Sequence, residues 1–418
     1  MAWLACFCCL HAWAEDACLR LDDTTANVRP SQGIYLLRDP AGALNFDAIR
    51  AADAAGKFAL LPGQNLNFGA SHDTLWLRFK VKNKSTSLSQ YYLTIDYPLL
   101  DSIDAYFVDE EGNFKLRSTG DSYPFSQRPL QTFSFHIPFT VAPQNGGLTI
   151  YIRVHSTSNL IVPIYLSTQE HLVEWLDWKR LIDGVFYGIT FGLLVYNLML
   201  FFTIRESHYI LIALNTIGCV LIIGSVDGLL YRLWPDNIFM EEIAALIIVN
   251  FTNIVMQLFS SQFMAVPQYH PTYYKWVQRF IYVCALVIIA EPFVDMTIIA
   301  YITMVLSFGT VIMGTVSGIL AYRRKHPFSG MFLLSWSMLI IGASFAILSV
   351  VGFITDFQLS IWGYKIGFVC ALLMLSITLG MRINQLKAEQ ANSERDFRME
   401  RESNLAKSEF LARMSHEI

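Results

Sequence analysis

The sequence predicts three successive parts: an all-β sandwich, a bundle of seven membrane-spanning helices and a charged helical segment. Of the 418 residues, 54% are hydrophobic and only 15% are charged, which is typical of integral membrane proteins. Short runs of alternating apolar and polar residues occur before residue 178, whereas long apolar runs begin at Leu181. The net charge of −4 is too small to indicate nucleic-acid binding.

The first 14 residues are predicted to be a signal peptide. An apolar run from Trp3 to Leu10 precedes Ala12-Trp13-Ala14, a small-x-small cleavage site. No basic residue lies near the start, so an uncleaved segment or a true start further upstream are the alternatives. Three of the seven cysteines lie here and three in the later apolar runs. Cys18 is therefore the only cysteine of the exported part, where no intrachain disulfide and no zinc-type spacing is expected.

Residues 15–178 are predicted to form the sandwich domain. Apolar and polar residues alternate through Leu75–Lys82, Ile103–Phe107 and Leu148–Val154. Pro-Gly, Glu-Gly and Gly-Gly pairs separate such segments, as turns require. Several short strands that each have one apolar face favour two sheets packed face to face.

Residues 181–381 are predicted to cross the membrane seven times. Each apolar run is about 20 residues long, enough for a hydrocarbon core of about 30 Å. The spans are placed near residues 181–204, 209–230, 240–264, 277–294, 297–321, 328–352 and 359–381.

Basic residues on alternate connections predict the orientation. One set of connections carries Arg205, Lys275, Arg323-Arg324-Lys325 and Arg382, whereas the other set is mainly acidic. The positive-inside rule places the basic set in the cytoplasm and residues 15–178 outside. Lys179-Arg180 opposes this rule but is outnumbered.

Polar residues inside the spans raise the question of a ligand. Lys365 in the last span could form a Schiff base with retinal if an acidic counter-ion faced it at mid-membrane. It lies about two turns from the outer end, so we expect its amine to snorkel to the interface. Retinal is also disfavoured because Ile361 stands where microbial rhodopsins carry aspartate. Interhelical hydrogen bonds, or the hinge of a switch, are expected for Asn197, Asn215, Asn250, Asn253 and Gln257.

Residues 382–406 read as a continuous charged helix without Pro or Gly. A 3–4 spacing from Ile383 to Met414 is apolar only at its two ends, so a coiled coil in this register would be weak in the middle. Such a seam can shift between two packings in a homodimer. A solvated connector is the alternative.

The last twelve residues carry the strongest functional pattern. As a helix, they place Leu411, Met414 and Ile418 on one apolar stripe and His416 on the opposite, wet face. Glu417 follows the imidazole directly. A phosphoryl acceptor needs an exposed ring nitrogen and a neighbouring acid.

This segment, KSEFLARMSHEI, resembles the H-box of histidine kinases, which reads K-S-x-F-L-A-x-M-S-H-E-I. The resemblance implies that residues 407–418 begin the dimerisation domain, with His416 as phosphoacceptor and Glu417 as its acid/base partner. It implies ATP and Mg²⁺ for a catalytic domain that this chain lacks, so the chain alone is not expected to be active. It also implies a response regulator or receiver domain as partner. A merely solvated helix histidine is the alternative, and no metal site is expected.

A second resemblance covers nearly the whole chain. The segments that carry it are Asn67–Gly69, Trp76–Phe79, Asp96–Asp101, Gly120–Pro129 and Leu148–Ser156. They resemble the extracellular jelly-roll of bacterial 7TMR-DISM receptors, here of RetS-type sensor kinases in the inner membrane. Because that jelly-roll is similar to carbohydrate-binding modules, a periplasmic glycan or other small ligand is expected. The predicted binding face consists of Trp76, Arg78, Tyr106, Tyr151 and Arg153; the alternative is that these residues pack under a loop or across a sheet.

Together these patterns favour the membrane sensor of a two-component histidine kinase. The rival interpretation is a non-catalytic regulator that pairs with another histidine kinase and inhibits it. A cyclic-dinucleotide synthase is disfavoured because it would not need the H-box.

Overall fold

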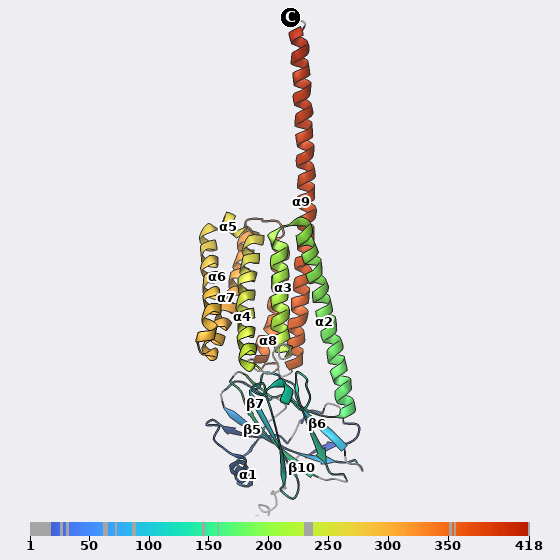
Figure 1. Ribbon diagram of the computed structural model, residues 1–418, viewed down its shortest axis with the longest axis vertical. Helices are drawn as coiled ribbons and strands as arrows, with labels where there is room; N and C mark the ends of the chain where they lie inside the picture. Colours follow the sequence, from blue (N-terminus) through green and yellow to red (C-terminus); the bar gives the residue numbers. More distant parts are fainter. Residues whose placement is uncertain are drawn as a thin grey trace, which may run out of the picture.

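The computed structural model describes residues 18–25, 28–30, 33–61, 66–71, 73–85, 89–143, 147–157, 159–229, 237–350, 353–354 and 357–416. The signal peptide predicted for residues 1–14 lies outside these ranges. A β sandwich and the end of one long helix lie on opposite sides of a helical bundle (Figure 1). The predicted fold class is thereby confirmed.

The larger sheet of the sandwich has the strand order β3-β2-β5-β10-β7-β8, and β1 pairs in parallel with β5. Its strands are β1 (Cys18–Leu21), β2 (Tyr35–Asp39), β3 (Ala59–Leu60), β5 (Thr74–Asn83), β7 (Ser102–Val108), β8 (Phe114–Thr119) and β10 (Gly147–His155). We call it sheet A. β8 lies at one edge of it.

The smaller sheet, sheet B, has the order β12-β6-β9. Its strands are β6 (Ser89–Ile95), β9 (Phe135–Val141) and β12 (Ile164–Thr168). β4 (Asn67–Ala70) and β11 (Asn159–Ile161) form a separate pair. β12 is followed directly by the first long helix, so sheet B is the sheet joined covalently to the helical bundle.

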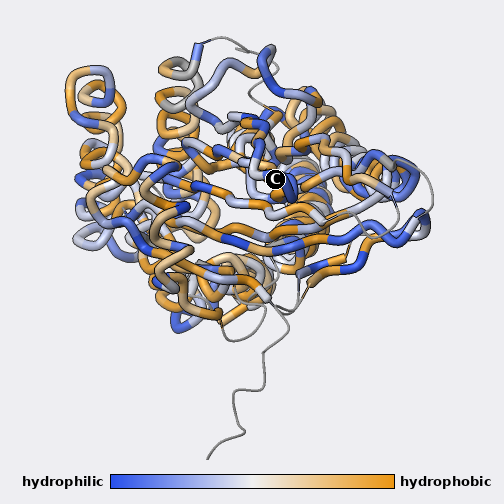
Figure 2. Tube along the Cα trace, turned by 90° about the horizontal axis from the view of Figure 1, so that it is seen from below, coloured by the Kyte–Doolittle hydropathy of each residue, from blue (hydrophilic) through white to orange (hydrophobic). Residues whose placement is uncertain are grey.

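The core lies between the two sheets because inward and outward residues alternate along each strand. Leu75, Leu77, Phe79 and Val81 of β5 are at most 1% exposed. Hydrophobic and hydrophilic residues alternate along the strands in Figure 2, as the sequence predicts.

A short helix, α1 (Phe46–Ala54), lies over the outer face of sheet A. Asn45 caps its N-terminus by accepting a hydrogen bond from the Ala48 backbone. The apolar side chains of Phe46 and Ile49 are buried against Trp76 and Tyr151 of the sheet. The sandwich therefore has a third layer, which the sequence did not predict.

The membrane part contains seven helices, among the described residues, that are long and apolar enough to cross a bilayer. They are α2 (Gln169–Ile204), α3 (Ser207–Val226), α4 (Ile238–Phe263), α6 (Pro271–Ala290), α7 (Met296–Arg323), α8 (Ser329–Val350) and α9 (Phe357–His416). The membrane part also contains two short helices, α5 (Val266–Tyr269) and η3 (Glu291–Phe293). Another short helix, η1 (Phe125–Gln127), lies in the sandwich. The seven predicted spans each fall on one of these seven helices.

Helices α8 and α9 approach each other closely at glycines. Gly363 and Gly367 lie one turn apart on α9, and a Cβ on Gly367 would lie 2.6 Å from the Gly342 Cα of α8. Small residues at this spacing let helix backbones come into contact in membranes. α8 and α9 are therefore packed backbone to backbone, with no room for a larger side chain.

Candidate functional site

The predicted ligand face is covered rather than open. Trp76 is fully buried, and Arg78 and Tyr151 are 9% and 6% exposed. Asp53 of α1 accepts hydrogen bonds from Arg78 Nη1 at 2.7 Å and from the Tyr151 hydroxyl at 2.6 Å. The expectation of an exposed aromatic and cationic surface is wrong here, because α1 occupies this face.

The two other members of that set also make internal contacts. Tyr106 stacks on Phe46 of α1 with ring centroids 4.0 Å apart. Arg153 forms an ion pair with Asp104 at 3.2 Å. Burial raises the pKa of the Tyr151 hydroxyl, and its hydrogen bond to Asp53 raises this pKa further. Asn45 followed by apolar residues three apart is the sequence pattern that could have predicted α1.

The sandwich meets the helices at Asp96, immediately after β6. Its carboxylate is 1% exposed and forms an ion pair with Lys179 of α2 at 3.1 Å. It also accepts hydrogen bonds from the side chains of Ser134, just before β9, and of Gln358 in the first turn of α9. One carboxylate thus joins sheet B to the first and the last membrane helix, and we call this set the Asp96 junction.

The charge at this junction is held by its donors. Burial alone would raise the pKa of Asp96, but Lys179 and the hydrogen bonds from Ser134 and Gln358 bring that pKa below its usual value. Asp96 is therefore ionised at neutral pH. Lys179, the cation that opposes the positive-inside rule, has a structural partner on the sandwich side.

A buried histidine lies beside the junction. His136 of β9 is 1% exposed, and its Nδ1 lies 2.8 Å from the hydroxyl of Thr94, its cross-strand neighbour. The indole of Trp175 in α2 approaches the imidazole edge-on. Burial lowers the pKa of His136 to about 4; Asp96 opposes this shift and Lys179 adds to it. The imidazole is therefore neutral at pH 7.

Within the bundle, Lys365 of α9 is buried rather than snorkelling. It is 4% exposed, and its Nζ lies 2.8 Å from Asp183 of α2 and 2.7 Å from Asp227, which caps the end of α3. Tyr187 donates a hydrogen bond to Asp227 at 2.8 Å. The snorkelling prediction is wrong because two carboxylates solvate the amine inside the protein. We call Lys365, Asp183 and Asp227 the ion triad.

Most of the polar residues noted in the spans make the predicted interhelical hydrogen bonds. Asn250 donates to Glu291 and Thr303, and Asn253 to Ser307. The side chain of Gln257 donates to the Thr310 carbonyl, and that of Asn197 to Ser376 of α9. Asn215 is buried, and the described residues offer its side-chain oxygen no partner.

Helix α9 connects the junction and the triad to the segment that resembles the H-box. Gln358 is in its first turn, Lys365 lies seven residues later, and His416 is its last residue. Residues 384–408 are exposed throughout. The side chain of His416 and all of Glu417 lie outside the described part, so their roles stay predictions. Among the described residues, no group of three His, Cys, Asp or Glu side chains could hold a metal ion.

The chain is distantly similar to several solved structures. Two structures of an exo-β-1,3-galactanase from Phanerochaete chrysosporium with β-1,3-galactotriose are 10% identical, with TM-scores of 0.17 and 0.15. The matched segments make up 34% and 33% of this chain, and 29% and 26% of the two galactanase chains. This chain thus spans less than a third of those enzymes, and such TM-scores carry no argument. No curated protein matches the chain.

Two sequence families do match. The family described as 7TMR-DISM extracellular 2 matches residues 31–168, which include most of the sandwich. The family described as 7TM diverse intracellular signalling matches residues 179–382, from Lys179 of the Asp96 junction to the membrane exit of α9. The chain therefore carries the extracellular and the seven-transmembrane domains of the 7TMR-DISM receptors, and is a multi-pass membrane protein built as a signalling sensor.

Proposed function

We propose that this chain is the sensor, membrane and acceptor-helix part of a dimeric histidine kinase in a bacterial inner membrane. In this proposal the sandwich detects a small periplasmic ligand, and α9 carries the response to His416 in the cytoplasm. The observation that supports it best is the continuity of α9, which runs from a hydrogen bond with the sandwich to the H-box without interruption.

The length of α9 suits this role. From Gln358 to His416 the helix rises roughly 87 Å at 1.5 Å per residue. Gln358 contacts the sandwich, and Lys365 ties the same helix to α2 and α3. A rotation or shift imposed at the Asp96 junction would therefore reach the exposed half of the helix.

The exposed half of α9 supports a dimer. Leu386 lies near one end of the predicted seam and is 37% exposed. Phe397 is an apolar residue in the middle of the seam, where only polar residues were expected, and it is 68% exposed. A second copy of α9 in parallel would cover these side chains. Because polar positions interrupt the seam, the pairing would be weak enough to switch between two packings.

The chemistry assigned to His416 follows from the H-box. A neutral imidazole nitrogen would accept the phosphoryl group, and Glu417 would take or hold the proton on the other nitrogen. Bound to a catalytic domain, ATP with Mg²⁺ would supply that phosphoryl group and leave as ADP. In this proposal the described residues do not bind ATP; they position the acceptor His416.

Labelling of the full-length protein, with its catalytic domain, tests the proposal. In lipid nanodiscs with γ-labelled ATP, we expect an acid-labile adduct that disappears in His416→Gln and persists in the control His171→Gln, a helical histidine of α2. Undiminished labelling of His416→Gln would refute the assignment. An unlabelled wild type that suppresses labelling of a co-reconstituted kinase would support the non-catalytic regulator instead.

A further inference from the structure

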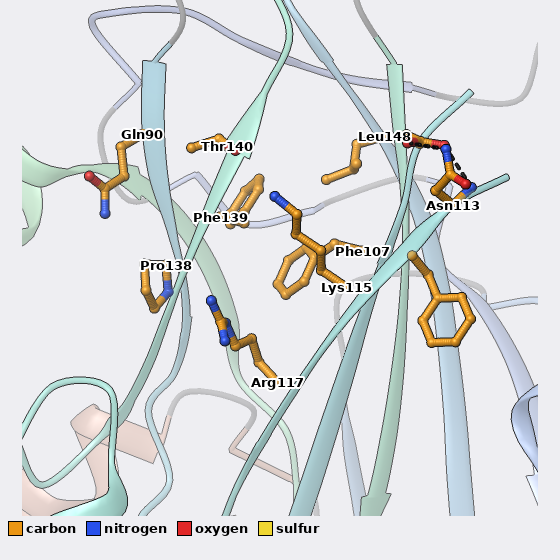
Figure 3. Close-up of a pocket in the computed structure, with 11 residues that line it drawn as sticks. Gln90, Phe107, Asn113, Lys115, Arg117, Pro138, Phe139, Thr140 and Leu148 are labelled. Atoms are coloured by element: carbon orange, nitrogen blue, oxygen red, sulfur yellow. Dashed lines mark hydrogen bonds between the residues drawn. The ribbon is translucent and has the colours of Figure 1, made fainter. Parts of the chain in front are cut away.

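A cleft of about 490 Å³ opens where sheets A and B part at their edge strands β8 and β9 (Figure 3). Its volume falls in the range of small-molecule sites, about 300–1,000 Å³. Its lining includes Phe107, Lys115, Arg117, Pro138, Phe139 and Thr140. It lies on the opposite side of sheet A from α1, although Phe114 at its rim also contacts Phe46 of α1.

Two cations of β8 point into this cleft. Lys115 and Arg117 pair in register with Phe107 and Ala105 of β7, whose side chains belong to the core. They therefore lie on the inner face of sheet A, where an edge strand passes beyond the cover of sheet B. In Figure 3 both side chains extend across the cleft toward Pro138 and Phe139.

Neither cation has an anionic partner in the part of the chain that the structure describes. The carboxylate that lines the cleft is that of Asp109. It is engaged in its own turn, where it accepts from the Asn113 backbone at 2.8 Å and from the Asn113 side chain at 3.3 Å. The cleft thus carries two cations and one carboxylate, and no described residue forms an ion pair with either cation.

The floor of the cleft is aromatic. Phe107 of sheet A and Phe139 of sheet B stack with ring centroids 5.1 Å apart and an interplanar angle of 15°. Both are almost fully buried, so the floor is fixed by the core. An apolar surface below two cations suits a ligand with a flat or ring-shaped body and acidic substituents.

We propose that this cleft is the ligand site of the receptor, and that its ligand is a small organic dianion built on a ring. Side chains two residues apart on a strand lie roughly 7 Å apart, which sets the spacing of the two acidic groups. Acidic sugars and aromatic dicarboxylates both have this chemistry. The inference rests on the proposed receptor function and adds the place and charge of the ligand.

The cleft and the Asp96 junction share two strands. Gln90 borders the cleft at the start of β6, and Asp96 follows the end of that strand. β9 begins beside Ser134 of the junction and reaches the cleft at Pro138 and Thr140. A ligand that bridges β8 and β9 would fix sheet B relative to sheet A, and sheet B holds the carboxylate that contacts α2 and α9.

Binding to the full-length receptor in nanodiscs tests the site. The probes are digalacturonate, with its neutral dimethyl ester as control, and naphthalene-2,6-dicarboxylate. We expect saturable binding of at least one dianion, weakened about tenfold or more by Lys115→Gln and by Arg117→Gln. Lys82 is exposed on the outer face of β5, so the control variant Lys82→Gln should bind the dianion as the wild type does.

The outcomes separate the possibilities. Equal binding by Lys115→Gln, Arg117→Gln and wild type, or binding of neither dianion, would overturn the proposal. Inward cations on an edge strand can also serve only to prevent strand pairing; self-association of the double variant without any loss of binding would show that role. Cation-dependent binding that leaves His416 labelling unchanged would retain the site and refute the kinase sensor instead.

Discussion

The neutral histidine beside the Asp96 junction predicts that acid loosens sheet B. His136 has a pKa of about 4 in the folded sandwich, against about 6.5 for an unperturbed histidine. Between these values the unfolded chain binds a proton that the folded chain does not. The free energy of unfolding therefore rises with pH across this window. The part of it that comes from the neutral imidazole of His136 is lost as pH falls from 6.5 to 4.

The size of the effect follows from the two pKa values. The slope approaches about 1.4 kcal/mol per pH unit, and between pH 7 and pH 5 the expected loss is about 1.8 kcal/mol, or roughly a 20-fold change in the unfolding equilibrium. Asp96 does not contribute in this range. Its pKa lies below the ordinary value, so its stabilising contribution is lost only at more acidic pH.

Amide hydrogen exchange in β6 and β9 of the full chain measures this loss, once each rate is corrected for the intrinsic effect of pH. His136→Asn should remove the pH-dependent part while shifting stability at all pH values. His155→Asn, at the end of β10, serves as the control and should keep the wild-type difference. A wild-type slope that persists in His136→Asn would refute the reasoning.

Three further substitutions test the connections along α9. Asp96→Asn removes the ion pair of the junction and should weaken the docking of sheet B on the helices by about 1–3 kcal/mol, measured as faster amide hydrogen exchange in the first turns of α9. The control Asp73→Asn removes an exposed ion pair and should change this exchange little. Lys365→Met leaves two carboxylates facing each other and should cost about 3–5 kcal/mol in thermal unfolding in detergent; an unchanged transition would contradict a buried triad. Gly367→Leu should force α8 and α9 apart, which should cost about 1–3 kcal/mol or more of stability and lower the unfolding temperature. Gly184 has open space around it, so Gly184→Leu should leave the unfolding temperature unchanged.

Periodicity predicted the elements because it reports burial on each side of a segment. The alternation at Leu75–Lys82 became β5, and the seven apolar runs became seven helices. The spans predicted at residues 277–294 and 297–321 are separate helices, because Asp295 between them caps α7 by accepting hydrogen bonds from the Thr297 and Ile298 backbones. These features depend on neighbouring residues, which a sequence displays directly.

Contacts between distant residues could not be predicted in the same way. Alternation shows that Trp76 and Arg78 face away from the core, but not that α1 lies on top of them. Lys365 pairs with carboxylates 182 and 138 residues earlier in the chain. Lys179 is a basic residue on the otherwise acidic side of the bundle, and this departure from the charge pattern could have indicated that it would pair with an acidic residue of the sandwich.

The contacts of α9 differ in strength, and this difference determines how a signal could pass. Near Gly342 and Gly367 the backbones of α8 and α9 touch, so separating them would sacrifice close packing along both helices. The triad can be broken only by leaving charge unpaired inside the bundle. The Asp96 junction, by contrast, joins sheet B to α2 and α9 through side-chain contacts around one buried carboxylate, and the side chain of Lys179 there is partly exposed. A ligand that distinguishes two sheet arrangements by a few kcal/mol could therefore shift the junction, and α8 and α9 would respond together as one body.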